Sequence, residues 1–196
     1  IIPKTVTSAI SYTFENCINL KRVEYYGTYY ELRGYAFKGC TNLQTIIAPN
    51  ITSDVTGFSG MTSLKTVDVS KVSTIDDSAF KGCTNLETII SSAYDVGEYA
   101  FYECKSLKKF LLHSPFATSS IGRYAFYNCD SLYEVSFPSN ARISDYAFSG
   151  CGGFTGSLII GDGVTGFLSN SGTFISAKFT KDLDYLEKYI KSKILH

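Results

Sequence analysis

Apolar residues return along the chain at a nearly constant spacing. Six cysteines and one methionine mark the repeat, and successive markers are 21 to 25 residues apart. The markers are Cys17, Cys40, Met61, Cys83, Cys104, Cys129 and Cys151. A phenylalanine precedes each marker by three residues, at Phe14, Phe37, Phe58, Phe80, Phe101, Phe126 and Phe148. A large apolar residue follows each marker by three, at Leu20, Leu43, Leu64, Leu86, Leu107, Leu132 and Phe154. Matches at fixed offsets with this period indicate a solenoid of stacked coils.

Each leucine after a marker opens the pattern L-x-x-V-x-V, in which apolar and polar residues alternate. Leu64, Val67 and Val69 form one copy, and Leu132 and Val135 belong to another. Alternation over so few residues predicts a short strand with one buried face. Similar strands about 22 residues apart, each followed by a return segment, are expected to stack in parallel with right-handed crossovers.

The return segment has a different apolar spacing. An apolar residue lies eight positions before most markers, at Ala9, Leu32, Ile75, Val96, Ile121 and Ile143. The phenylalanine, the marker and the leucine are three apart, which favours one short helical turn over a strand. The phenylalanines are expected to stack as an aromatic column. The predicted fold is an α/β repeat solenoid, with short parallel strands on a concave face and short helical or 3-10 turns on the convex face.

Two coils depart from this pattern. Val55 lies only six residues before Met61, so the third return segment is shortened. In the seventh coil one extra residue precedes Leu158 and Ile160, which are expected to take the inward strand positions. The coil that follows, residues 161–167, is degenerate and has no cysteine.

The period changes near the C-terminus. Leu183, Leu186, Ile190 and Ile194 lie three or four residues apart, which predicts an amphipathic helix from about Asp182 to Leu195. We expect this helix to cap the apolar end of the solenoid, with a partner-binding helix as the alternative. The predicted division is residues 1–167 for about seven coils and residues 168–196 for a degenerate repeat and the capping helix.

The composition excludes several classes of partner. Eighteen basic residues balance eighteen acidic ones among the 196 residues, so no long-range attraction to nucleic acid or to acidic lipid is expected. No apolar run approaches the roughly 20 residues that span a bilayer. The chain opens in the middle of a repeat and carries no signal peptide, and we interpret it as a fragment or a processed form.

The cysteines do not have the spacing of a metal site. No C-x-x-C pair occurs. Met61 replaces one cysteine without a compensating loss elsewhere, which favours a buried apolar slot that holds free thiols. Disulfides between neighbouring coils are the alternative.

Catalytic motifs are equally scarce. The two histidines, His113 and His196, lie in neither a nucleophile elbow nor a metal-binding helix motif. The many serines leave a Ser-His-Asp arrangement open. We expect no enzyme activity, no metal and no cofactor.

Three strings make the repeat recognisable: Tyr35-Ala-Phe-Lys-Gly-Cys-Thr-Asn-Leu43, Ser120-Ile-Gly-Arg-Tyr-Ala-Phe126 and Ile2-Pro-Lys-Thr-Val-Thr-Ser8. They resemble the BspA-like, or Treponema-type, leucine-rich repeat family over about residues 1 to 167. The resemblance implies a large surface or secreted protein that adheres to host proteins or to other cells. Fold alone does not fix that function.

Outward residues of the predicted strands form the candidate binding face, because solenoids commonly bind through this surface. They are Arg22, Glu24, Thr45, Ile47, Thr66, Asp68, Thr88, Ile90, Lys109, Leu111 and Glu134. Ile47, Ile90 and Leu111 are expected to be exposed and to mark an interface, although β-branched residues also suit strands for their own sake. Asp68 is expected to separate Ile47 from Ile90.

Tyrosines form two further groups. Tyr12, Tyr35, Tyr99, Tyr124 and Tyr146 recur five residues before a cysteine, which favours a structural column on the convex side. Tyr26, Tyr29 and Tyr30 interrupt the repeat in a loop and are candidate ligand contacts.

The leading hypothesis is a non-enzymatic recognition module of a cell-surface or secreted protein. It would bind a protein or glycan on a host or neighbouring cell through the concave face. The alternatives are a structural spacer that displays another domain and an intracellular interaction scaffold.

Overall fold

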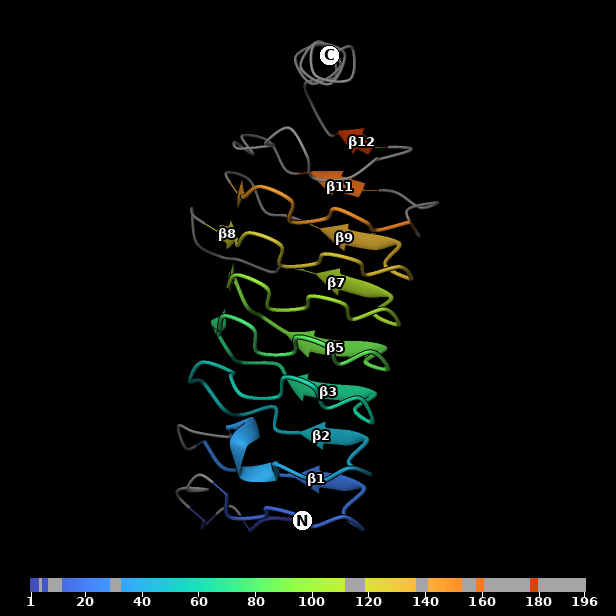
Figure 1. The fold of residues 1–196 in the computed structure, drawn as a ribbon. Helices are drawn as coiled ribbons and strands as arrows, with labels where there is room; N and C mark the ends of the chain where they lie inside the picture. Colours follow the sequence, from blue (N-terminus) through green and yellow to red (C-terminus); the bar gives the residue numbers. More distant parts are fainter. Residues whose placement is uncertain are drawn as a thin grey trace.

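The chain forms a stack of similar coils, one above another, in a computed structural model (Figure 1). The structure describes residues 1–152 except 4, 7–11, 29–32, 112–118 and 137–140, together with the strand residues 158–160 and 177–179. Each coil contributes one strand to the same side of the stack. The predicted repeat solenoid is therefore confirmed.

The strands of this side form two parallel four-stranded sheets. The first sheet runs in the order β1 (Arg22–Glu24), β2 (Thr45–Ile47), β3 (Thr66–Val69) and β5 (Thr88–Ser91). The second runs in the order β7 (Lys109–Leu111), β9 (Glu134–Ser136), β11 (Leu158–Ile160) and β12 (Ala177–Phe179). We call the outward side of these strands the strand face.

The register confirms the predicted alignment of the repeats. Val23, Ile46, Val67 and Ile89 are paired across the first sheet. Leu158 pairs with Val135, so the seventh coil takes up its extra residue before the strand, as expected. β12 adds a parallel strand inside the segment predicted to be a degenerate repeat. Residues 161–167 and the predicted helix at 182–195 lie outside the described residues.

The return segments contain a third parallel sheet, which the sequence did not predict. Its strands are β4 (Thr74–Ile75), β6 (Asp95–Val96), β8 (Ser119–Ile121) and β10 (Ala141–Ile143). Four of the apolar residues eight before the markers, Ile75, Val96, Ile121 and Ile143, lie on these strands and are buried, whereas Ala9 and Leu32 lie outside the described residues. Val55 joins the same row through a bridge to Ile75, so the shortened third coil keeps its place in the stack.

Helix is scarcer than predicted. The 3-10 helix η1 (Gly34–Phe37) is the one helical element among the described residues. In the other coils the phenylalanine and the marker lie in hydrogen-bonded turns, in which the marker N–H donates to the phenylalanine carbonyl. The prediction of a turn rather than a strand holds for this part of the coil, and the coil of η1 is the one described coil in which the turn is a helix.

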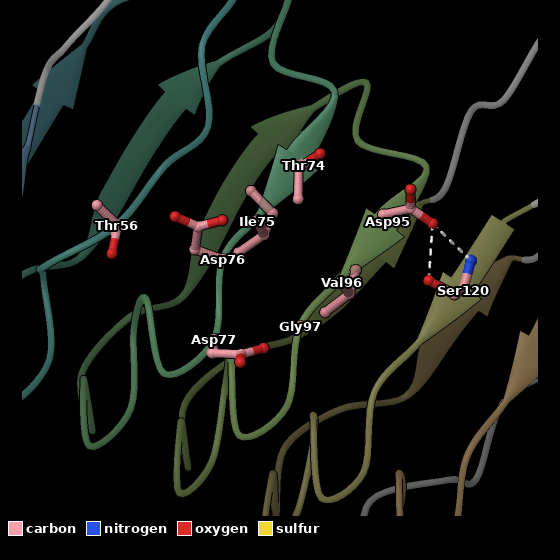
Figure 2. A pocket seen from close by; sticks show the side chains of 9 residues that line it. All are labelled: Thr56, Thr74, Ile75, Asp76, Asp77, Asp95, Val96, Gly97 and Ser120. Atoms are coloured by element: carbon pink, nitrogen blue, oxygen red, sulfur yellow. Dashed lines mark hydrogen bonds between the residues drawn. The ribbon is translucent and has the colours of Figure 1, made fainter.

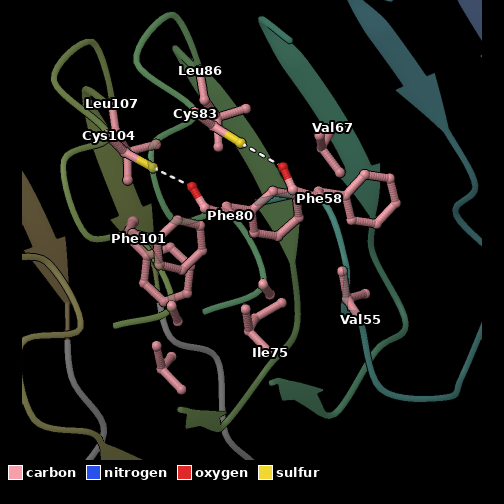
Figure 3. Packing of buried hydrophobic residues seen from close by; sticks show 14 of the residues in the cluster. Val55, Phe58, Val67, Ile75, Phe80, Cys83, Leu86, Phe101, Cys104 and Leu107 are labelled. Carbon is pink, nitrogen blue, oxygen red and sulfur yellow. Dashed lines mark hydrogen bonds between the residues drawn. The ribbon is translucent and has the colours of Figure 1, made fainter. Parts of the chain in front are cut away.

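The phenylalanines stack through the core, as predicted (Figure 3). Phe80 and Phe101 lie with ring centroids 5.4 Å apart, and Phe101 and Phe126 with centroids 5.1 Å apart. Phe110, which enters from β7, packs against Phe101 and Phe126 at 5.1 Å in each case. Buried aromatic rings at these distances attract one another beyond the effect of area burial.

The cysteines are free thiols, and each of five donates a hydrogen bond to the preceding coil. Cys83 Sγ lies 3.0 Å from the carbonyl of Phe58, and Cys104 Sγ lies 3.1 Å from that of Phe80 (Figure 3). The same bond recurs at Cys40, Cys129 and Cys151. The acceptor carbonyl also binds the N–H of its own marker, so the thiol occupies its second acceptor position.

The first cysteine departs from the prediction of buried thiols. Cys17 is exposed, whereas the other five cysteines are buried. Burial raises the pKa of the Cys83 thiol from 9.0 to about 12 and raises that of Cys104 well above its ordinary value. Their role is therefore packing and hydrogen bonding, and reactivity is confined to the N-terminal coil.

The residue before each marker has a left-handed backbone. Glycine occupies this position in four coils, and Gly60 is typical with φ of +75°. Glu103 adopts the same conformation with φ of 58° and has no such freedom. Because a side chain at positive φ crowds its own backbone, this turn stores strain in the coil that carries Glu103.

Candidate functional site

The structure brings the predicted binding residues together on the strand face. Along β1, β2, β3 and β7 the residue between two outward residues is buried, as the alternating pattern required, and Val135 of β9 is buried as well. Two rows follow from the register. The first row is Arg22, Thr45, Thr66 and Thr88, and the second is Glu24, Ile47, Asp68 and Ile90. Lys109 lies opposite Glu134 in the second sheet.

The N-terminal part of this face is polar. Arg22 forms an ion pair with Glu24, and the Tyr26 hydroxyl donates to the same carboxylate at 3.4 Å. The hydrogen bond from Arg22 lowers the pKa of Glu24 most, and the bond from Tyr26 acts in the same direction. Tyr26 is exposed, as predicted. Tyr29 and Tyr30 lie outside the described residues.

The middle of the face is divided as the sequence indicated. Asp68 lies between Ile47 and Ile90 in the register. The hydroxyl and the backbone N–H of Ser70 both donate to the Asp68 carboxylate, which fixes its position. Ile47 is half-buried and is separated from the other exposed aliphatic residues. The expected three-residue patch is therefore reduced to Ile90 and Leu111.

Ile90 and Leu111 lie at a junction where the strand ladder is interrupted. No ladder pairs β5 with β7 in the described part of the chain, although both strands occupy neighbouring coils (Figure 1). At the junction before it, the Lys65 carbonyl accepts two N–H groups, from Glu87 at 2.9 Å and from Thr88 at 3.1 Å. At the interrupted junction the Glu87 carbonyl accepts the N–H of Lys108 at 3.3 Å.

A cleft of about 340 Å³ occupies this junction. Ile89, Ile90, Phe110 and Leu111 supply its apolar walls, and Tyr133 lies at its margin. Ile89 is only partly buried, whereas Ile46, its partner two strands away in the register, is fully buried. The cleft therefore reaches toward the core between two coils.

The charged side chains around the cleft bind one another. Lys108 Nζ lies 2.6 Å from a carboxylate oxygen of Glu87, and Lys109 Nζ lies 2.5 Å from one of Glu134. The hydrogen bond from Lys108 lowers the pKa of Glu87, and the bonds to the two carboxylates raise the pKa of both lysines. The Lys109 ammonium also lies 5.4 Å from the ring centre of Tyr133. The rim is therefore neutral at physiological pH.

A second hollow of about 410 Å³ lies on the return side and was not foreseen (Figure 2). Asp95 accepts the N–H and the hydroxyl of Ser120 at 3.0 and 2.7 Å, and Asp77 accepts the N–H of Glu98 at 2.7 Å. Burial raises the pKa of Asp76, and nearby carboxylates add to that effect. In the described ranges, no three His, Cys, Asp or Glu side chains converge as metal ligands would. Two of the aspartates thus join neighbouring coils.

Three of the five convex tyrosines form the stacked column that their spacing predicted, whereas Tyr12 and Tyr35 are about half exposed. Tyr124 stacks on Tyr99 at 5.3 Å and on Tyr146 at 4.9 Å. A second stack, which sequence analysis missed, joins Tyr102 to Tyr127 at 5.0 Å. The signal was present in the sequence, because both tyrosines lie two residues before a cysteine.

Catalytic chemistry gains no support from the described residues. His113 and His196 both lie outside them. The described part of the chain also contains no helix with the length and apolar character to cross a membrane.

Comparison with known proteins supports the repeat assignment. No curated protein sequence matches the chain. A leucine-rich repeat protein from Bacteroides ovatus, known from its crystal structure, is 20% identical with a TM-score of 0.38, and the match covers 74% of this chain and 50% of that protein. The family model described as "BspA type Leucine rich repeat region (6 copies)" matches residues 1–108 and 54–174. The chain therefore belongs to the BspA-type leucine-rich repeat family.

Proposed function

We propose that the chain is a non-enzymatic recognition module of a cell-surface or secreted protein. It binds a protein or glycan on a host or neighbouring cell through the strand face and so contributes to adhesion. Membership of the leucine-rich repeat family supports this proposal, because these repeats are typical protein-interaction modules.

The exposure of Ile90 and Leu111 carries the proposal. The two residues are 49% and 38% exposed on a face whose other outward residues are mostly polar. They flank the cleft at the interrupted junction. Large aliphatic groups gathered at one hollow on a strand face are characteristic of an interface, because their burial by a partner is favourable.

The test measures saturable binding of the fluorescently labelled chain to cultured epithelial cells and to bacterial cells. We expect Ile90→Asp and Leu111→Asp to lose binding while their circular dichroism stays unchanged. Ile18→Asp is the matched control, because Ile18 is 55% exposed and lies away from the strand face, in the turn after Cys17. Absence of saturable binding by the unaltered chain to either cell type would favour the spacer hypothesis instead.

A further inference from the structure

We infer that the cleft between β5 and β7 receives an apolar side chain of a protein partner rather than a sugar ring. This inference rests on the proposed function and specifies the chemical class of the ligand. Three features of the cleft support it: its apolar walls, its neutral rim and its size.

The walls of the cleft are apolar, and the cleft reaches toward the core. Phe110 occupies the slot that Val23, Ile46, Val67, Ile89 and Val135 take in other coils. Its ring packs against the rings of Phe101 and Phe126, which stack directly on each other. Phe110 is bulkier than these counterparts, and the ladder is interrupted on the β5 side of β7, where Ile89 is only partly buried, while Phe110 pairs with Val135 on the β9 side.

The rim offers little to a sugar. Recognition of a glycan requires polar groups that are free to bind hydroxyls, together with an open aromatic face. Here Lys108 and Lys109 bind Glu87 and Glu134, and the Lys109 ammonium also lies over the ring of Tyr133. A neutral, apolar side chain can enter without breaking these pairs or leaving a charge unpaired.

The size fits one bulky side chain. Small-molecule sites in proteins occupy roughly 300 to 1,000 Å³, and the cleft holds about 340 Å³. Thr88 and Ser91 also line the cleft and add no charge to it, and the Ser91 hydroxyl oxygen is covered by protein atoms.

Methyl NMR of the complete chain, labelled with carbon-13 at the isoleucine methyls, tests the cleft directly. The probes are N-acetyl-leucinamide and N-acetyl-phenylalaninamide, with N-acetyl-serinamide and N-acetylglucosamine as polar controls. We expect the apolar probes to shift the Ile89 and Ile90 methyls saturably, with at least about tenfold higher affinity than the polar probes. The methyls of Ile46, which is buried, and of Ile18, which is exposed elsewhere, are the reference signals.

Three results would overturn the inference: no saturable shift, an equal response to N-acetylglucosamine, or an Ile18 response equal to that of Ile90. The Leu111→Asp chain is expected to lose the response while its Ile46 methyl signal stays in place. The inference and the proposed function fail in different ways. If cell binding survives Leu111→Asp but is lost in Ile47→Asp, the inference about the cleft is wrong and the proposed function stands. If the unaltered chain binds no cell, the proposed function is wrong.

Discussion

Truncation of one ring in the phenylalanine column tests the physical basis of the fold. In Phe101→Ala the lost ring is fully buried and has stacked neighbours on both sides, Phe80 at 5.4 Å and Phe126 at 5.1 Å. The tilted ring of Phe110 lies 5.1 Å away as a third neighbour. The cavity left by the substitution is therefore lined mainly by aromatic rings that are already held in place by their own coils.

The expected cost follows from these contacts. Replacement of a buried phenylalanine by alanine costs about 3–5 kcal/mol, and three ring neighbours place Phe101 at the upper end, because each aromatic pair adds about 0.5–1.5 kcal/mol beyond burial. Phe14 is only partly buried, and its stacked neighbour is Phe37 at 5.4 Å. We expect Phe14→Ala to cost about 2 kcal/mol or less, because the lost area and the number of ring contacts are both smaller.

Urea unfolding followed by far-ultraviolet circular dichroism measures both variants. The midpoint of Phe101→Ala should fall, and its melting temperature should drop by roughly 8–16 °C, with a smaller change for Phe14→Ala. Equal losses in the two variants, or a loss below about 1 kcal/mol in Phe101→Ala, would mean that the stacked rings do not hold the coils together.

Three further predictions address the thiols and the turns. At pH 8 a thiol-specific disulfide reagent should label Cys17 alone in the folded chain and all six cysteines after unfolding, because the buried thiols stay protonated and covered; rapid labelling of a second thiol would contradict this. The free energy of unfolding should fall as pH rises from 9.0 toward about 12, because the pKa of the Cys83 thiol is higher in the folded chain and the thiol therefore loses its proton first in the unfolded chain. The urea midpoint of Cys83→Ala should fall less over that range. Gly60→Ala should lower the free energy of unfolding by about 1 kcal/mol through backbone strain alone, because an added Cβ meets no atom within 4 Å. Glu103→Gly should raise the free energy of unfolding by about 1 kcal/mol. Urea midpoints that move in the opposite directions would refute the strain argument.

The inward columns could be predicted from sequence because each repeats with little variation in every coil. Phe101, Cys104 and Leu107 lie three apart, and their counterparts in the other coils keep the same offsets. A strand position such as Val67 is supported by alternation on either side of it. The register of β1, β2, β3 and β5 then follows, because strands in stacked coils align at equal offsets from their markers.

The sheet of the return segments could not be predicted in the same way. β4 and β6 are two residues long, and each places one residue, Ile75 or Val96, in the core. One apolar residue gives no alternation to distinguish a strand from a turn. The hydrogen bonds of the thiols were also hidden, because Met61 occupies the same slot without a donor and suggested that packing alone selects the residue.

Sequence identified the outward residues of the candidate site but missed the cleft. The step from Cys83 to Cys104 is 21 residues, as short as that from Cys40 to Met61, so spacing gave no sign of an interrupted ladder. The one signal was the size of Phe110, which stands where neighbouring coils carry valine or isoleucine. A fixed spacing reports that coils stack, and it does not report how closely two particular strands approach.

The substitution Phe110→Val tests whether that ring causes the interruption. Valine at this slot in β3 and β9 accompanies paired strands, so the shorter side chain should let β7 approach β5. We expect amide hydrogen exchange in β7 to slow and the Ile89 and Ile90 methyls to stop responding to N-acetyl-leucinamide. Overall stability should fall, because Phe101 and Phe126 lose a neighbour. A variant that loses stability yet keeps fast exchange and probe binding would show that the cleft has another cause. A solenoid of identical coils has a uniform strand face. One inward residue that is larger than its counterparts in the other coils is then sufficient to open one apolar cleft on that face.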